Sequence, residues 1–312
     1  MIIKSSAPAK LIITGEHSIL HGYSAISMAI KQRMNVEIIK NKTNDKTIKI
    51  NSKEFGNYQG IFNENYKPTN DWYSPILFII SRLSQVGYTI NIKSNIDSYG
   101  FGASGALFVC VAGGIIKSLT QYSKSKYELA NEIFLLYKDF LKEKKQQKYH
   151  SGIDIITSIF GGVVYFEPKI NKIILLPNDL FKQFNGITAI YTGHKTDTDD
   201  AYKVADKTTN KDEIYEKMGT LTQKIYEQIV YGDKEKFEKY IVKNQEYLEK
   251  LGLCDDETNE ILKMCKQHNH SAKISGSGLG DCVLVFDKVE TDKYKTTDIK
   301  IDNNGLIVDI VR

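Results

Sequence analysis

Two patterns of apolar and polar residues alternate along the chain, and together they predict an α+β protein. Apolar residues that alternate or cluster over roughly four to eight positions are typical of strands, while apolar residues repeating every three or four positions are typical of helices. The strand pattern occurs in KLIIT, MNVEII, TIKI, YTINIKS, GITAIYTG and GLIVDIV. The helix pattern occurs in SPILFIISRLSQVG, in residues 104–118, in KYELANEIFLLYKDFLKE and across the charged segment 199–265. Segment 51–71 is polar, with Gly, Asn and Pro, and is expected to be a loop.

The pattern restarts after Pro177, and this divides the chain into two parts. A length of 312 residues is enough for one large domain or for two ordinary domains that share an interface. We expect an N-terminal domain over residues 1–180 and a C-terminal domain over residues 181–312, both α+β, that meet at a cleft. Within the second part, AKISGSGLGDCVLVF predicts a strand, a glycine loop and another strand.

Composition and charge exclude several classes of function. The net charge of +4 is small for this length, and Arg occurs only at Arg33, Arg82 and Arg312. Because Arg is the preferred side chain for contacting guanine edges, a sequence-specific DNA-binding protein is not expected. The four cysteines form no CxxC pair and match no zinc spacing. The N-terminus lacks a signal-peptide pattern, and no apolar run approaches the ~20 residues of a membrane span, so we expect a cytoplasmic protein without membrane or nucleic-acid partners.

The segment SYGFGASGALFVC places a glycine-rich turn before an apolar helix. Gly100, Gly102 and Gly105 match the GxGxxG dinucleotide fingerprint, but the second strand that this fingerprint needs does not follow. A P-loop is excluded, because Ala106 and Leu107 stand where Lys and Ser or Thr are required.

A third interpretation is phosphate binding by backbone amides at a helix N-terminus. Glycines let the main chain approach phosphate closely, and the first helical N–H groups and the helix dipole then face the anion. Ser104 is placed for its hydroxyl to reach a phosphate oxygen or Mg²⁺. The alternative, a tight turn in which the glycines serve packing alone, stays open on this segment.

Charged residues elsewhere supply further candidate chemistry. Lys10, Glu16 and His17 surround a strand in APAKLIITGEHSIL, and Asp154 lies in the apolar run SGIDIITSIFGG. A carboxylate among apolar residues is costly to bury unless it is paired or functional. Glu143 precedes Asp154 near the end of the preceding predicted helix.

Taken together, these segments resemble the motifs of the GHMP kinase superfamily, in family order from residue 7 to about 286. The opening motif is similar to APAKLIITGEH followed by HGYSAISMAI, the nucleotide loop to GFGASGA, and the catalytic-Asp segment to SGIDIITSIFGG. YTGHKTDT resembles the strand-and-Thr segment, and KISGSGLGDCVLVF resembles the third glycine-rich motif. The nucleotide loop departs from the family pattern: it lacks the usual Pro, and Phe101, Ala103 and Gly105 replace Leu, Ser and Ala.

The resemblance implies a GHMP-kinase-like two-domain α+β fold with mixed and antiparallel sheets and helices, an active site in the interdomain cleft, and ATP and Mg²⁺ as cofactors. It implies a role for Asp154 in accepting or orienting the proton of the acceptor hydroxyl, and a pairing of Lys10 with Asp154. The remaining implied roles are nucleotide binding for Gly100, Phe101, Gly102, Ala103, Ser104 and Gly105, metal binding for Ser104 and Glu143, substrate binding for His17, Glu16 and Thr196, and a supporting loop of Gly276, Gly278 and Gly280.

The implied reaction is transfer of the γ-phosphoryl group of ATP to the 5-hydroxyl of mevalonate, a step of isoprenoid precursor synthesis. Phosphomevalonate or another small alcohol is an alternative acceptor, and a non-catalytic ligand-binding regulator of the same fold is a further alternative. A purely structural ion pair for Lys10 and a solvated surface position for Glu143 also stay open. A monomer or a homodimer is expected.

Overall fold

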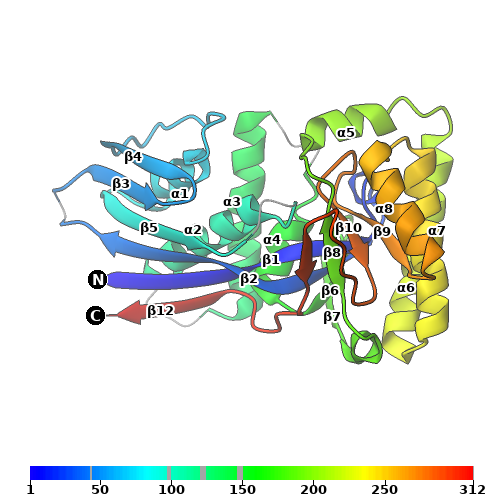
Figure 1. The fold of residues 1–312 in the computed structure, drawn as a ribbon. Coiled ribbons are helices and arrows are strands. Elements are labelled where there is room, and N and C mark those ends of the chain that lie inside the picture. The colour runs from blue at the N-terminus through cyan, green and yellow to red at the C-terminus, as the bar shows by residue number, and fades with distance from the viewer. Residues whose placement is uncertain (43, 97–99, 120–123, 146–149, 312) are drawn as a thin grey trace.

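The computed structural model describes residues 1–42, 44–96, 100–119, 124–145 and 150–311, which form two sheets flanked by helices (Figure 1). In the described residues the larger sheet has eight strands, in the order β12-β1-β2-β5-β3-β4, with β6 paired to β2 and β7 paired to β6. Its pairs are antiparallel except for β3 and β5, which are parallel. The strands are β1 (Ile2–Thr14), β2 (Ala25–Lys40), β3 (Thr47–Ser52), β4 (Gly56–Ile61), β5 (Tyr88–Ser94), β6 (Val163–Glu167), β7 (Lys172–Leu176) and β12 (Ile307–Val311).

Four helices pack with the larger sheet and bury its apolar face (Figure 1). They are α1 (Ser74–Leu83), α2 (Ala103–Leu119), α3 (Lys126–Lys144) and α4 (Ile153–Phe160). Helix α2 lies on β1 and β2, and it is buried continuously from Gly105 to Ile116. A helix that is apolar on every side is stable only inside a core, which explains why the segment after the glycine turn contains so few polar residues.

The smaller sheet is antiparallel in the order β11-β8-β10-β9, and helices pack beside it, two of which also contact β1 of the larger sheet (Figure 1). Its strands are β8 (Thr188–Tyr191), β9 (Ala272–Ser275), β10 (Cys282–Val285) and β11 (Thr296–Asp298). The helices of this part are α5 (Thr198–Ala205), α6 (Lys211–Tyr231), α7 (Lys234–Lys250) and α8 (Asp256–Gln267). The short 3-10 segments are η1 (Ser18–His21) and η3 (Asp179–Gln183).

The two sheets share an apolar core. Leu11 and Val163 of the larger sheet belong to the same buried cluster as Ala189 and Leu284 of the smaller one. The last strand, β12, returns to the larger sheet and pairs with β1, so the N- and C-terminal strands lie side by side (Figure 1). The division at about residue 180 stays a prediction. Because β12 lies after residue 180 but pairs with β1, a single boundary along the chain does not separate the two sheets.

The α+β class with mixed and antiparallel sheets is confirmed, but the pattern did not predict every strand. Segment 51–71, expected to be a loop, contains β4, whose sequence GNYQGI has little apolar alternation. This strand lies at the edge of the sheet, where polar residues face solvent and the periodic signal is weak. No helix in the described part of the chain combines the length and apolar character that a membrane crossing needs.

Candidate active site

The glycine-rich turn leads directly into α2, as the sequence predicts. Gly100 and Gly102 have φ values of 78°, a region that residues with a side chain rarely adopt. The backbone N–H of Lys10 donates a hydrogen bond of 2.8 Å to the carbonyl oxygen of Phe101. The Phe101 ring is 1% exposed and belongs to the shared core, so it anchors the turn while the backbone stays close to the N-terminus of the helix.

Lys10 and Asp154 flank this turn at two different glycines. A Cβ atom built on Gly102 would lie 3.1 Å from Cε of Lys10, and one built on Gly105 would lie 2.6 Å from Oδ2 of Asp154. The space that a side chain would need is therefore occupied by the methylene chain of Lys10 at Gly102 and by the Asp154 carboxylate at Gly105. The sequence departure at Gly105, where the family has Ala, has a physical counterpart here, because the Asp154 carboxylate fills the place of the missing methyl group.

The expected direct ion pair between Lys10 and Asp154 is not formed. No distance of 4.0 Å or less joins the Lys10 ammonium to a carboxylate among the described residues. Each side chain lies against its own glycine of the turn, with the amine on β1 and the carboxylate in the first turn of α4. The strand changes register beside β2 between Pro8 and Ala9, just before Lys10, and such an irregularity re-aims the following side chains.

A third charged side chain, which the sequence motifs did not single out as a site residue, meets the same turn. Asp281 is 7% exposed, and a Cβ atom on Gly100 would lie 2.6 Å from its Oδ2. Burial raises the pKa of the Asp281 carboxyl, while Lys195, Lys10 and His194 oppose that rise. The only sequence signal for this residue is an acid at the end of the glycine cluster GSGLGD, directly before a buried strand.

Glu16 is buried and makes an ion pair with Lys273 of β9. Asn244 donates to the other carboxylate oxygen of Glu16 at 3.4 Å. Desolvation lowers the pKa of the buried Lys273, and Glu16 opposes that shift. The Glu16 carboxylate thus joins the segment after β1 to the smaller sheet.

His17 is held in a buried and conformationally unusual position. Its φ is 58°, and its Nε2 lies 2.7 Å from the carbonyl oxygen of Ser277, so this nitrogen carries the proton and donates. Burial lowers the pKa of His17 to about 4, so the ring is neutral near pH 7. Its Nδ1 is buried and has no hydrogen-bond partner among the described residues, and the Tyr202 ring lies 4.3 Å away between centroids.

The structure gives Glu143 partners that the sequence did not predict. This glutamate lies at the end of α3 and forms an ion pair with Arg82 of α1, and Lys67 Nζ lies 3.8 Å from its second oxygen. Ser104, the other predicted metal residue, is exposed in the first turn of α2.

The second glycine cluster forms a backbone loop between β9 and β10. Gly276, Gly278 and Gly280 all have positive φ values, and a Cβ atom on Gly278 would lie 2.8 Å from Leu253. The Thr196 hydroxyl donates to the carbonyl oxygen of Leu279 in the same loop. Thr196 therefore contacts the loop itself in this structure.

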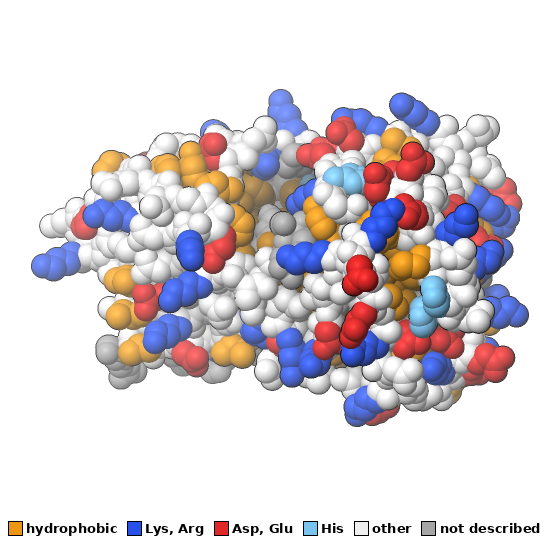
Figure 2. Space-filling model, viewed as in Figure 1, with side chains coloured by type: hydrophobic (Ala, Val, Ile, Leu, Met, Phe, Trp, Pro, Cys, Tyr) orange, Lys and Arg blue, Asp and Glu red, His pale blue; other side chains and the backbone are white. Residues whose placement is uncertain are grey.

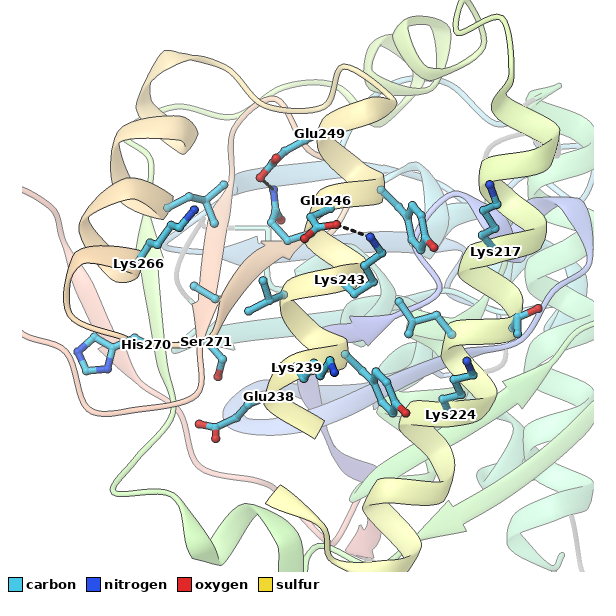
Figure 3. A pocket seen from close by; sticks show the side chains of 18 of the residues that line it. Lys217, Lys224, Glu238, Lys239, Lys243, Glu246, Glu249, Lys266, His270 and Ser271 are labelled. Atoms are coloured by element: carbon cyan, nitrogen blue, oxygen red, sulfur yellow. Dashed lines mark hydrogen bonds and ion pairs between the residues drawn. The ribbon is translucent and has the colours of Figure 1, made fainter. Parts of the chain in front are cut away.

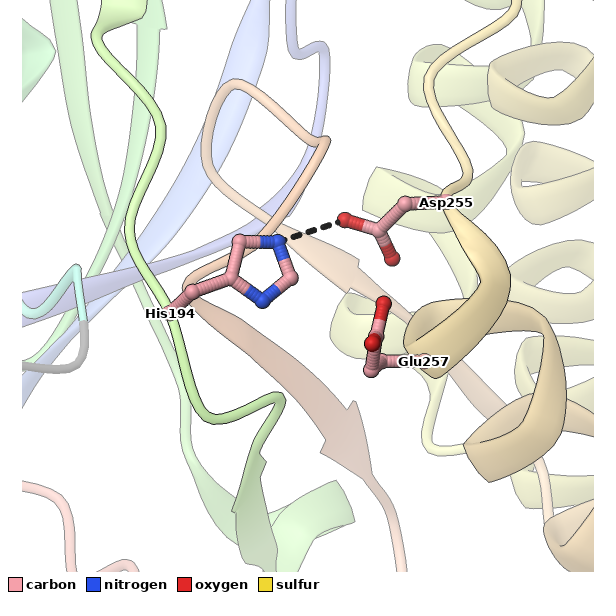
Figure 4. Close-up of side chains that lie close together, drawn as sticks. All are labelled: His194, Asp255 and Glu257. Carbon is pink, nitrogen blue, oxygen red and sulfur yellow. Dashed lines mark hydrogen bonds and ion pairs between the residues drawn. The ribbon is translucent and has the colours of Figure 1, made fainter.

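His194 ties the segment after β8 to α8 (Figure 4). Its Nε2 lies 2.9 Å from Oδ2 of Asp255, and the possible ligand atoms of His194, Asp255 and Glu257 lie within 4.8 Å of one another. Asp255 also accepts a hydrogen bond of 2.8 Å from the backbone N–H of Thr258 as the N-cap of α8. Capping and one ion pair thus account for this cluster as a structural joint.

One groove of the surface lies away from the glycine-rich turn. The face drawn in Figure 2 is hollowed where the two sheets meet, and Lys, Arg, Asp and Glu are interspersed across it. A cavity of about 1430 Å³ lies instead between α6, α7, α8 and β9, lined by Lys and Glu side chains with Tyr240 and Tyr247 (Figure 3). None of the predicted site residues lines that groove.

Known proteins resemble this chain in sequence and in fold. Residues 223–295 match the family model described as GHMP kinases C terminal. The chain is 28% identical over 304 residues to the mevalonate kinase of Methanocaldococcus jannaschii, with 94% of each chain covered. The crystal structure titled Methanococcus jannaschii mevalonate kinase superposes with a TM-score of 0.77 at 24% identity, covering 97% of this chain and 98% of that one. A Lactococcus lactis galactokinase complexed with galactose superposes with a TM-score of 0.79 at 15% identity, covering 98% and 95%.

The two-sheet α+β fold that carries the glycine turn before α2 is shared with solved small-molecule kinases. The matched GHMP kinase family model covers residues 223–295, and over nearly its whole length the chain is similar to mevalonate kinases. The galactokinase superposition at 15% identity shows a shared fold, and a fold alone does not identify the acceptor.

Proposed function

We propose that the chain is an ATP-dependent kinase that transfers the γ-phosphoryl group to the 5-hydroxyl of mevalonate. The observation that carries the proposal is the approach of Lys10 and Asp154 to two glycines of one helix-capping turn. A cation, a carboxylate and free helical amides are the groups that phosphoryl transfer to an alcohol requires.

The triphosphate binds over the turn from Gly100 to Gly105. The glycines allow close approach of the backbone, and the N-terminus of α2 favours the negative charge. The oxygen donors beside the turn, the Ser104 hydroxyl and the neighbouring carboxylates, are of the kind that Mg²⁺ prefers. When bound with the nucleotide, Mg²⁺ neutralises charge on the β- and γ-phosphates.

The acceptor hydroxyl lies beside the Asp154 carboxylate, near the turn. The carboxylate orients the hydroxyl and accepts its proton as the new bond to phosphorus forms. Lys10, held beside Gly102, stabilises the negative charge on the phosphoryl group in transfer. His17 and Thr196 lie at the edge of the proposed acceptor-binding site. The Nδ1 of His17, which has no hydrogen-bond partner among the described residues, accepts a hydrogen bond from the substrate. Glu16 acts through Lys273 and β1, holding His17 in place.

The acceptor is tested by measuring ADP release with mevalonate, phosphomevalonate and galactose under identical conditions. We expect turnover with mevalonate and little or none with the other two. Faster turnover with phosphomevalonate would reassign the acceptor, and ATP binding without turnover on any acceptor would favour a regulatory protein of this fold. Cytoplasmic location and a monomeric or homodimeric state are part of the same proposal.

A further inference from the structure

Asp281 lies at the first glycine of the turn, and one of its carboxylate oxygens makes no hydrogen bond to any residue that the structure describes. The residue is 7% exposed, and Oδ1 makes no hydrogen bond among the described residues. Its Oδ2 lies against Gly100, at 2.6 Å from the position of a Cβ atom there. The group is therefore directed at the N-terminal end of the turn that leads into α2.

Backbone hydrogen bonds hold Asp281 so that its side chain is directed at the turn. The N–H of Asp281 donates to the His194 carbonyl oxygen at 3.0 Å, and its own carbonyl accepts from the Thr192 N–H at 3.0 Å and from the Thr192 hydroxyl at 3.1 Å. Its φ is 60°, an uncommon value for a residue with a side chain. Strained backbone that aims a polar group into a cleft is typical of ligand-binding positions.

Asp281 has positively charged neighbours but no direct ion pair among the described residues. Lys10, Lys195 and His194 act on the carboxylate electrostatically, but no ion pair within 4.0 Å is formed with it among the described residues. A triphosphate on the turn would bring further negative charge to the same place. Like charges brought close together at a protein surface repel, and a divalent cation between them replaces that repulsion with attraction.

Glu143, the acid that the sequence predicted as a metal ligand, forms an ion pair with Arg82 instead. We propose that Asp281 supplies the carboxylate ligand, direct or through one water, of the divalent cation that accompanies the triphosphate, in place of Glu143. This inference rests on the proposed kinase function, because it needs a nucleotide on the turn. Mg²⁺ bound through one carboxylate, phosphate oxygens and waters is the usual arrangement for nucleotide enzymes.

The test uses Mn²⁺ as the probe and a nonhydrolysable ATP analogue. Free Mn²⁺ is counted by electron paramagnetic resonance during titration of the protein with and without the analogue. The variants are Asp281→Asn and Asp281→Gly, because Asn and Gly both tolerate a positive φ and leave the backbone in place. Glu143→Gln tests the competing ligand, and Asp292→Asn, an exposed acid of the same part of the chain, is the matched control.

We expect both Asp281 variants to weaken Mn²⁺ binding in the nucleotide complex by about tenfold or more, the range seen when ligand shells of metal sites are altered. Their affinity for the analogue in EDTA stays equal or rises, since a negative charge is removed. Glu143→Gln and Asp292→Asn keep the wild-type Mn²⁺ affinity.

Unchanged Mn²⁺ affinity in both Asp281 variants overturns the inference and leaves the kinase proposal standing. A loss of Mn²⁺ affinity in Glu143→Gln alone also overturns it and returns the role to Glu143. A wild-type protein that binds the analogue neither with Mn²⁺ nor without it overturns the kinase proposal and this inference together.

Discussion

At the scale of single residues, the most direct prediction concerns Asp154. Asp154→Asn keeps the size of the side chain but removes its capacity to accept a proton, so kcat falls by roughly 10²–10⁴-fold while the Kd for ATP changes little. Coupled measurement of ADP release gives kcat, and calorimetric titration gives Kd. Asp139→Asn, on the exposed side of α3, is the matched control and retains wild-type kcat. A variant at 154 with most of the wild-type rate removes this carboxylate from the mechanism.

His17 gives a prediction for stability against pH. Its pKa is about 4 in the folded protein and 6.5 as the ordinary value, so the unfolded chain binds the proton more tightly between these pH values. The free energy of unfolding therefore falls as pH is lowered from 6.5 towards 4, by about 3 kcal/mol from this group. Urea unfolding of wild type and His17→Asn at pH 7 and pH 5 isolates the contribution, because the variant lacks the titrating ring. The exposed His268→Asn serves as control, and equal pH slopes for wild type and His17→Asn contradict the assignment.

At the scale of elements, the start of α2 separates stability from catalysis. Gly105→Ala adds a methyl group 2.6 Å from Oδ2 of Asp154 and displaces the carboxylate from its place on the turn. Ala is favoured over Gly in a helix by roughly 1 kcal/mol, so we expect unchanged or higher thermal stability together with a loss of kcat. Gly114→Ala, later in the same helix and against Ile38 of the core, is the control that changes stability without lowering kcat. Thermal unfolding and ADP release measured on the same samples check both halves, and full activity in Gly105→Ala contradicts the placement of Asp154.

Local pattern is enough to predict the elements that carry the turn. The glycine spacing and the apolar run after it predict the start of α2, and Lys10 and Asp154 are visible because each is a charge within an apolar segment. The partners of the buried charges are not predictable in this way, since Glu16 and Lys273 are 257 positions apart and Arg82 and Glu143 are 61 apart. Asp281 was missed for the same reason: only the folded chain places the end of one glycine cluster against the beginning of another.

At the scale of the whole molecule, the return of β12 predicts one cooperative unit. β12 pairs with β1, and the shared core includes Leu11 of the larger sheet and Leu284 of the smaller one, so neither half buries its apolar surface alone. We expect a single thermal transition whose calorimetric and van't Hoff enthalpies agree to a ratio of about one. Residues 1–180 expressed alone lack β12 and expose the shared core, so they unfold or aggregate. A folded fragment 1–180, or two separate transitions in the intact chain, would show that the two parts are independent domains and that the cleft between them opens without unfolding either one.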